Sequence, residues 1–199
     1  MGKEELASFR FARHYPELGD GPVPVEPYIS ADYFEREAGH ARAGRPARIV
    51  IKLNALVEPR SIQALYAASQ AGVEVDLIVR GMCALRPGVP GVSERIRVRS
   101  VVGRFLEHTR VFYFQNGGEA EVYCGSADWA ERNFFRRVEV CFPILDEALR
   151  TRVTDELMLY LADNQQAWEL LADGAYRRVE HGAAAAVSAQ QTLLERLGV

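Results

Sequence analysis

The sequence predicts an α/β fold with a mixed sheet flanked by helices, and two patterns lead to that prediction. A short apolar segment at 48–53 is followed by helical periodicity at 59–71 and by a second apolar segment at 73–80. A strand, a helix and a strand in this order form a right-handed parallel crossover. Segments 110–114 and 121–124 flank an Asn-Gly-Gly turn and predict a hairpin. With 199 residues, the chain suits a single domain with a proper core.

The first third of the chain is expected to contain a leader and two helices. Residues 1–26 are predicted to be an irregular leader or linker, because their glycine and proline residues interrupt regular structure. Ser30 can cap a helix over 31–43. Pro59 suits the first position of the next helix, which Gly72 ends.

The remainder is expected to contain strands, then helices. A helix is predicted over 147–162, with a second short helical stretch reaching residue 171. The alanine-rich tail, residues 179–199, is predicted to be helical from 183 to 197, either loosely attached or serving as a contact for another part of an assembly. The predicted strands are 96–102, 110–114, 121–124 and 138–142.

Composition is typical of a globular cytoplasmic protein. Hydrophobic residues make up 48% of the chain and charged residues 26%. No run approaches 18 apolar residues, and the first residues lack the apolar stretch of a signal peptide, so no transmembrane segment is expected. The formal net charge of −3 does not indicate a nucleic-acid partner. Cys83, Cys124 and Cys141 lack the spacing of a zinc site or a disulfide framework.

Arginines are concentrated in one stretch of the chain, where only Glu94 and Glu107 oppose them. Guanidinium groups bind phosphate oxygens in a bidentate manner, so a phosphate channel is one interpretation. The alternation within 95–99 is also typical of the solvent-facing side of a strand, and the chain prefers arginine to lysine throughout. The seven arginines are Arg80, Arg86, Arg95, Arg97, Arg99, Arg104 and Arg110.

Two polar residues follow the predicted parallel strands. Asn54 comes after the strand at 48–53, and Arg80 ends the strand at 73–80. Ligands of such sheets bind at the carboxyl ends of the strands. Asn54 and Arg80 are therefore candidates for a binding edge.

The most informative motif is His108-Thr109-Arg110 followed by Gly125-Ser126-Ala127-Asp128. The hairpin between the two segments places His108 and Ser126 at its open end. A neutral imidazole can attack phosphorus or move a proton near pH 7, and an adjacent arginine can neutralise phosphate oxygens. The alternative is a surface histidine at the start of a strand, beside a solvated arginine.

This motif resembles the phospholipase D-type signature His-x-Lys followed by Gly-Ser-x-Asn, with Arg110 in place of the lysine and Asp128 in place of the asparagine. The wider run from Arg80 to Val140, with Asn116-Gly117-Gly118 inside it, closely resembles the last domain of the long-chain, histidine-dependent polyphosphate kinases. The resemblance extends over residues 27–178. It implies a phospholipase D-like mixed sheet, forming the second of two such domains.

The resemblance implies an activity and roles for matched residues. Such kinases transfer the terminal phosphate of ATP reversibly to polyphosphate through a phosphohistidine. His108 matches the second conserved histidine, and Arg80 matches an arginine that contacts nucleotide phosphates. Lys52, Arg110 and Ser126 are further candidates for phosphate binding. No metal ligand is predicted, because magnesium, which enters with ATP, is expected to be held mainly by the family's preceding domain.

The phosphorylated histidine of the family also belongs to that preceding domain, for which the chain has no matching motif. We therefore expect the chain to be inactive alone and to need the other polyphosphate kinase domains or a companion chain. One alternative is a phosphodiesterase with a single phospholipase D-like motif, in which a homodimer pairs two copies of His108. Another is a non-catalytic module that binds polyphosphate.

Overall fold

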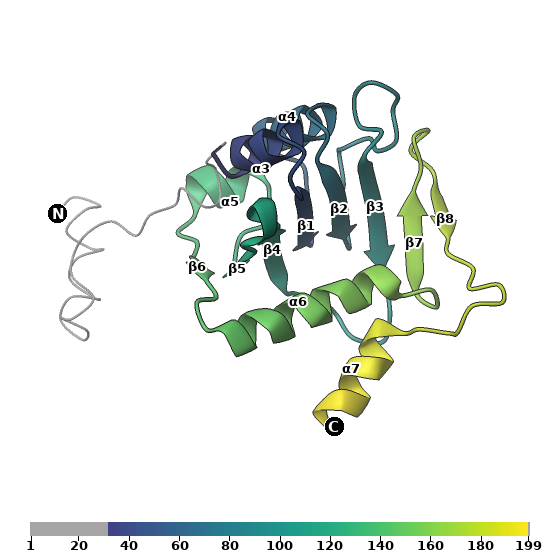
Figure 1. Ribbon diagram of the computed structural model, residues 1–199. Coiled ribbons are helices and arrows are strands. Elements are labelled where there is room, and N and C mark those ends of the chain that lie inside the picture. The colour runs from purple at the N-terminus through teal and green to yellow at the C-terminus, as the bar shows by residue number, and fades with distance from the viewer. Residues whose placement is uncertain (1–31, 199) are drawn as a thin grey trace.

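Three parallel strands, β1 (Arg48–Leu53), β2 (Glu74–Val79) and β3 (Ile96–Val101), form the centre of a mixed sheet (Figure 1). The computed structural model describes residues 32–198, so the predicted leader at 1–26 and the cap at Ser30 lie outside the described residues. In the described part, the sheet has eight strands in the order β6-β5-β4-β1-β2-β3-β7-β8. The outer strands are β4 (Arg110–Phe114), β5 (Glu121–Gly125), β6 (Cys141–Pro143), β7 (Ala167–Leu170) and β8 (Tyr176–Arg178).

Helices cover both faces of this sheet, as predicted. On one face lie α3 (Asp32–Arg42), α4 (Pro59–Gln70) and α5 (Glu131–Arg136). On the other face lie α6 (Glu147–Ala162) and α7 (Ala189–Leu197) (Figure 1). Because successive side chains of a strand point to opposite faces, β1 supplies Ile49 and Ile51 to the first core and Val50 to the second.

Side-chain caps fix where the two long helices begin. Glu58 accepts a hydrogen bond from the Ser61 amide at 2.6 Å, and Pro59 occupies the first turn of α4. Asp146 accepts from the Leu149 amide at 2.9 Å at the start of α6. The predicted bounds 147–162 are confirmed for α6, as are the bounds 110–114 for β4.

Helical structure predicted up to residue 171 is wrong, because the chain forms strand β7 there. Asp163 leaves the helical conformation, and its Oδ1 accepts hydrogen bonds from the amides of Gln165 at 3.0 Å and Gln166 at 2.7 Å. This turn reverses the chain, and β7 then pairs antiparallel with β3. β8, which pairs with β7, was not predicted.

Two further boundaries differ from the prediction. The strand expected at 138–142 is Cys141–Pro143, because the Val140 amide donates to the side-chain hydroxyl of Ser126 and the regular ladder with β5 begins at Cys141, opposite Gly125. The terminal helix expected from residue 183 begins at Ala189, because Asn164 binds the backbone of Ala185 and Val187 and holds the preceding segment in a non-helical conformation.

Gly117 gives a direct test of the hairpin turn. Its φ is +68°, and a Cβ there would lie 2.5 Å from Nδ1 of His40. We expect Gly117→Ala to lower the free energy of unfolding by more than about 1 kcal/mol, measured by urea denaturation. Gly44 has the same φ of +68° with open space around it. If Gly117→Ala lowered the free energy of unfolding no more than Gly44→Ala does, the close contact with His40 would contribute nothing to the loss of stability.

Candidate functional site

One edge of the sheet brings together the polar residues that the sequence places far apart. β1 and β2 are parallel and end at Leu53 and Val79. β4 runs antiparallel to β1, with Lys52 opposite Val111, and Arg110 pairs with Gly125 at the end of β5. The segments carrying Asn54, Arg80, His108, Arg110, Ser126 and Asp128 therefore meet at the carboxyl ends of β1 and β2, the edge where ligands of such sheets bind.

A buried ion pair forms the base of this edge. Arg110 donates from Nε to Oδ1 of Asp128 at 3.1 Å and from a terminal nitrogen to Oδ2 at 2.9 Å. Both side chains are 8% exposed. Asp128 Oδ1 also accepts from the amides of Asn54 at 2.8 Å and Ala55 at 3.3 Å. The pair therefore ties together β4, the end of β5 and the end of β1.

The surroundings of Asp128 stabilise its charged form. Burial acts to raise the pKa of this carboxyl, but the hydrogen bonds from Arg110 and the Asn54 amide outweigh that effect and leave the pKa below its ordinary value. Asp128 thus stays ionised at neutral pH, and Arg110 has a permanent counter-charge.

His108 is exposed, and Arg110 fixes one side of its ring. A terminal nitrogen of Arg110 lies 2.8 Å from Nδ1 of His108 and donates to its carbonyl oxygen at 2.9 Å. Because a guanidinium can only donate, Nδ1 must accept, and the proton of a neutral imidazole is then on Nε2. The ring therefore presents Nε2–H as a donor.

Arg80 lies at the same edge, and one of its three guanidinium nitrogens binds within the site. Its Nε donates to Oδ1 of Asn54 at 2.8 Å. Among residues 32–198, no hydrogen bond or ion pair involves its two terminal nitrogens. A half-buried guanidinium with an oriented, unused fork suits phosphate oxygens.

Comparison with known proteins shows the family to which the chain belongs. A family model described as polyphosphate kinase C-terminal domain 2 matches residues 28–190. The chain belongs to this family. The crystal structure of polyphosphate kinase from Porphyromonas gingivalis superposes with a TM-score of 0.84 and 35% identity, covering 94% of this chain and 30% of that one.

Curated relatives share the family but are much longer. The polyphosphate kinase of Xylella fastidiosa is 60% identical over 169 residues, which is 82% of this chain and 24% of that protein. That of Paraburkholderia phytofirmans is 55% identical over 179 residues, 89% of this chain and 26% of that protein. The chain thus spans about a quarter of the length of the curated relatives it matches.

Lys52 is paired in this polyphosphate kinase domain. Its side chain is 6% exposed, and Nζ lies 3.1 Å from Oε2 of Glu107 and 4.7 Å from the centre of the Tyr160 ring. Burial lowers the pKa of Lys52, Glu107 opposes that effect, and the nearby charges of Arg80 and Arg110 add to it. Direct phosphate binding by Lys52 stays a prediction, and it would require Glu107 to release the ammonium.

Ser126 and Arg110 also have structural partners. The hydroxyl of Ser126 donates to Glu139 and accepts from the Val140 amide at 2.9 Å, which ties the end of β5 to the segment before β6. All three nitrogens of Arg110 contact Asp128 or His108. The geometry therefore favours positioning roles for both, and their predicted contacts with phosphate stay predictions.

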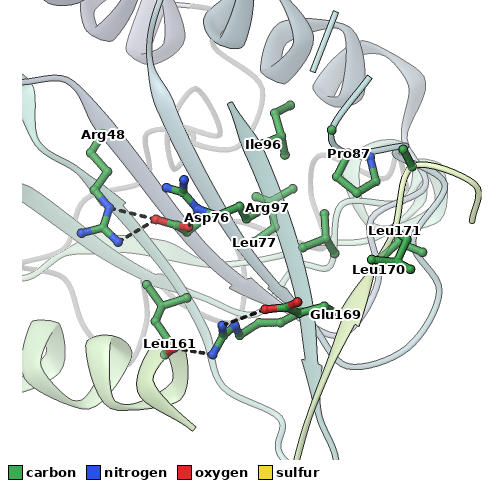
Figure 2. A pocket seen from close by; sticks show the side chains of 14 residues that line it. Arg48, Asp76, Leu77, Pro87, Ile96, Arg97, Leu161, Glu169, Leu170 and Leu171 are labelled. Carbon is green, nitrogen blue, oxygen red and sulfur yellow. Dashed lines mark hydrogen bonds and ion pairs between the residues drawn. The ribbon is translucent and has the colours of Figure 1, made fainter. Parts of the chain in front are cut away.

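Three arginines of the expected channel bind carboxylates elsewhere on the sheet. Arg95 pairs with Glu74, Arg97 with Asp76, and Arg99 with Glu169, as the solvent-facing interpretation of this strand anticipates. Arg97 and Arg99 line a groove of about 550 Å³ over β2, β3 and β7, in which Figure 2 shows Arg48 bonded to Asp76. None of the predicted site residues lines this groove.

Exposed apolar side chains occur in the chain segments next to those that form the His108 edge. Met82 follows Arg80, and Phe105 and Leu106 lie in the segment between β3 and β4. Val140 lies beside Ser126. Leu106 is 74% exposed and Val138 99%. Such a concentration of exposed apolar residues around a polar centre is typical of a surface that another polypeptide covers. We call this set the apolar rim: Met82, Val102, Phe105, Leu106, Val138 and Val140.

Among residues 32–198, no group of three or more His, Cys, Asp or Glu side chains could hold a metal ion. No helix of the described part is long and apolar enough to cross a membrane.

Sequence reasoning missed the partners that hold the site together. It left the role of Asp128 open, although Arg110 and Asp128 both replace residues of the phospholipase D-type signature, and their opposite charges were a signal for a pair. Asp128 does not cap α5, whose N-cap is Ala130. Glu107 and the two side chains that donate to it, Tyr160 and Gln190, gave no signal in the sequence.

Proposed function

We propose that this chain forms one half of the active site of an ATP:polyphosphate phosphotransferase, which transfers the terminal phosphate of ATP reversibly to polyphosphate. Family membership supports the reaction class. The observation that carries the proposal is a set of donors at one edge that bind no other group among residues 32–198, namely Nε2–H of His108 and the terminal nitrogens of Arg80. Phosphoryl transfer depends mainly on positioning and on stabilising charge, and such donors supply both.

In this proposal His108 supports the transfer and another histidine accepts the phosphoryl group. Attack on phosphorus needs a lone pair on Nε2, and the hydrogen bond from Arg110 to Nδ1 puts the proton there. Nε2–H would instead donate to the transferring phosphoryl group or to the leaving oxygen. Arg80 would bind the nucleotide phosphates, with magnesium entering together with ATP. The attacking histidine would belong to the part of the longer relatives that lies outside this match.

The apolar rim supports a partner in the proposed reaction. Other polyphosphate kinase domains, joined to this one or in a companion chain, would cover Met82, Leu106 and Val138 and would bring the second histidine opposite His108. Excluding water from the site in this way strengthens the electrostatic contacts within it. We place the reaction in the cytoplasm, where ATP and polyphosphate would be its substrates.

Phosphoryl transfer by the chain alone and with the other domains tests this function. We expect radiolabelled ATP and magnesium to give no acid-labile protein label and no polyphosphate with the chain alone. Adding the remaining domains of a polyphosphate kinase should restore both, while those domains alone should not form polyphosphate. Label on the isolated chain would contradict the proposal and would favour a dimer in which His108 itself is the nucleophile.

A further inference from the structure

A glutamine of the last helix holds the loop that carries His108. Residues 102–109 join β3 to β4 without helix or strand. Gln190, in the first turn of α7, is polar but only 5% exposed. Its side-chain oxygen accepts from the Phe105 amide at 2.9 Å, and its side-chain nitrogen donates to the Phe105 carbonyl at 2.9 Å. The glutamine amide thus satisfies both backbone groups of Phe105, as a neighbouring strand would.

The same amide group reaches the residue before His108. Gln190 Nε2 donates to Oε1 of Glu107 at 3.0 Å. The other carboxylate oxygen of Glu107 accepts from the Tyr160 hydroxyl at 2.7 Å and lies 3.1 Å from Nζ of Lys52. Glu107 is therefore bound on both oxygens, by groups from α7, α6 and β1. Because both oxygens of this largely buried carboxylate are bound by three separate elements, they restrain the segment next to His108.

Helix α7 is itself fixed to the body of the domain at the end that carries Gln190. Oδ2 of Asp163 accepts from the Ala189 amide at 2.8 Å, and Ala189 is fully buried. The Asn164 amide donates to the Val187 carbonyl at 3.0 Å. Gly103 passes so close to Gln190 that a Cβ at position 103 would collide with the glutamine oxygen. The loop and the helix are thus fitted to each other.

We propose that Gln190 is a positioning residue of the phosphotransfer site. It holds residues 102–109 so that His108 stays beside Arg110, which makes α7 part of the site although it lies in the alanine-rich tail. The catalytic consequence rests on the proposed function, whereas the restraint on the loop does not. Amide hydrogen exchange therefore tests the restraint on the loop, and turnover separately tests the catalytic consequence.

Amide hydrogen exchange of this chain tests the restraint. Gln190→Ala removes the contacts, and Gln190→Met removes them while keeping the length and helix propensity of the side chain. We expect either variant to speed exchange of the Phe105 amide by about tenfold or more. The control is Gln191→Ala, because Gln191 is exposed and, within the described part of the chain, its side chain binds only Glu195 of the same helix. Exchange no faster than in Gln191→Ala, in variants that unfold like wild type, would overturn the proposal.

Turnover with the remaining domains supplied tests the catalytic consequence. We expect Gln190→Met to lower kcat by about 10–100-fold, because a small displacement of a catalytic group has effects of this size. The KM for ATP should not change, because Arg80 lies outside the loop. Faster exchange with a wild-type kcat would overturn the positioning role. If the wild-type chain gives no turnover even with the remaining domains supplied, the proposed function fails, and the exchange result alone decides whether Gln190 restrains the loop.

Discussion

Replacing His108 by alanine is expected to lower kcat of the polyphosphate kinase reaction by about 10²–10⁴-fold when the remaining domains are supplied. The reason is the loss of the Nε2–H donor, since Arg110 fixes the ring through Nδ1. Fold stability should change little, because the ring is exposed. Steady-state formation of polyphosphate from ATP, alongside thermal unfolding, measures both effects.

Two amide substitutions separate the donor from the contact with Arg110. The side-chain oxygen of His108→Asn can take the place of Nδ1 and accept from Arg110, but this variant has no group at the position of Nε2. The side-chain nitrogen of His108→Gln lies near that position and can donate. We therefore expect the asparagine variant to be as inactive as alanine, and the glutamine variant to keep part of the activity.

The control for these variants is His181→Ala, because His181 is exposed and lies far along the chain, after β8. It should leave kcat unchanged. Equal activity of the glutamine and alanine variants would count against a hydrogen-bond donor. If His108 carried the phosphoryl group itself, acid-labile label would appear on this chain and would be absent from the alanine variant.

The strands and helices that patterning predicted well are those with a clear period or cap. Residues 147–162 have Asp146 as cap and form α6 as expected, and 110–114 form β4. The stretch up to residue 171 was predicted wrongly, because the carboxylate of Asp163 turns the chain back onto β3. That turn depends on side-chain contacts with the backbone, which hydrophobic periodicity does not report.

For the site, as for the fold, the sequence predicted features that depend on neighbouring residues and missed contacts between residues far apart in the chain. Strand ends predicted a binding edge with Arg80, and the hairpin predicted that His108 lies at its open end. That these two places form one edge follows from the pairing of β4 with β1. The sequence could not show that Gln190 contacts Phe105 and Glu107, which lie 85 and 83 residues away in the chain. Nor could it show that Glu107 pairs with Lys52, which the sequence offered as a candidate for phosphate binding. Long-range pairing of polar groups decides which charges remain free for phosphate.

Arg110→Met is expected to lower the free energy of unfolding at pH 7 by about 3–5 kcal/mol, because it leaves the Asp128 carboxylate buried without its counter-charge. Methionine keeps much of the volume of the arginine side chain, so the loss reports the charge more than a cavity. Urea unfolding followed by tryptophan fluorescence measures it, with Trp129 beside Asp128 in the sequence. The control is Arg136→Met, which breaks an exposed pair with Glu131 and should cost at most about 0.5 kcal/mol.

The stability of the wild type and that of Arg110→Met should change with pH in opposite directions. In the wild type the pKa of Asp128 lies below its unfolded value, so the pair contributes fully above about pH 4 and is lost as the pH falls through the folded pKa. In Arg110→Met, burial without a partner should raise the pKa of Asp128 above its unfolded value. That variant should therefore recover stability relative to wild type as the pH falls from 7 towards 5.

The double variant Arg110→Lys with Asp128→Asn restores the residue types of the phospholipase D-type signature and tests whether the two positions act as a unit. Asparagine can still accept from the amides of Asn54 and Ala55 through its side-chain oxygen, and it leaves no buried carboxylate. We expect the double variant to be more stable than the sum of the two single losses predicts, by up to about 3 kcal/mol. Additive losses would mean that Arg110 and Asp128 stabilise the edge separately. Coupled losses would mean that the pair acts as one support, which fixes the end of β1 and the ring of His108 together.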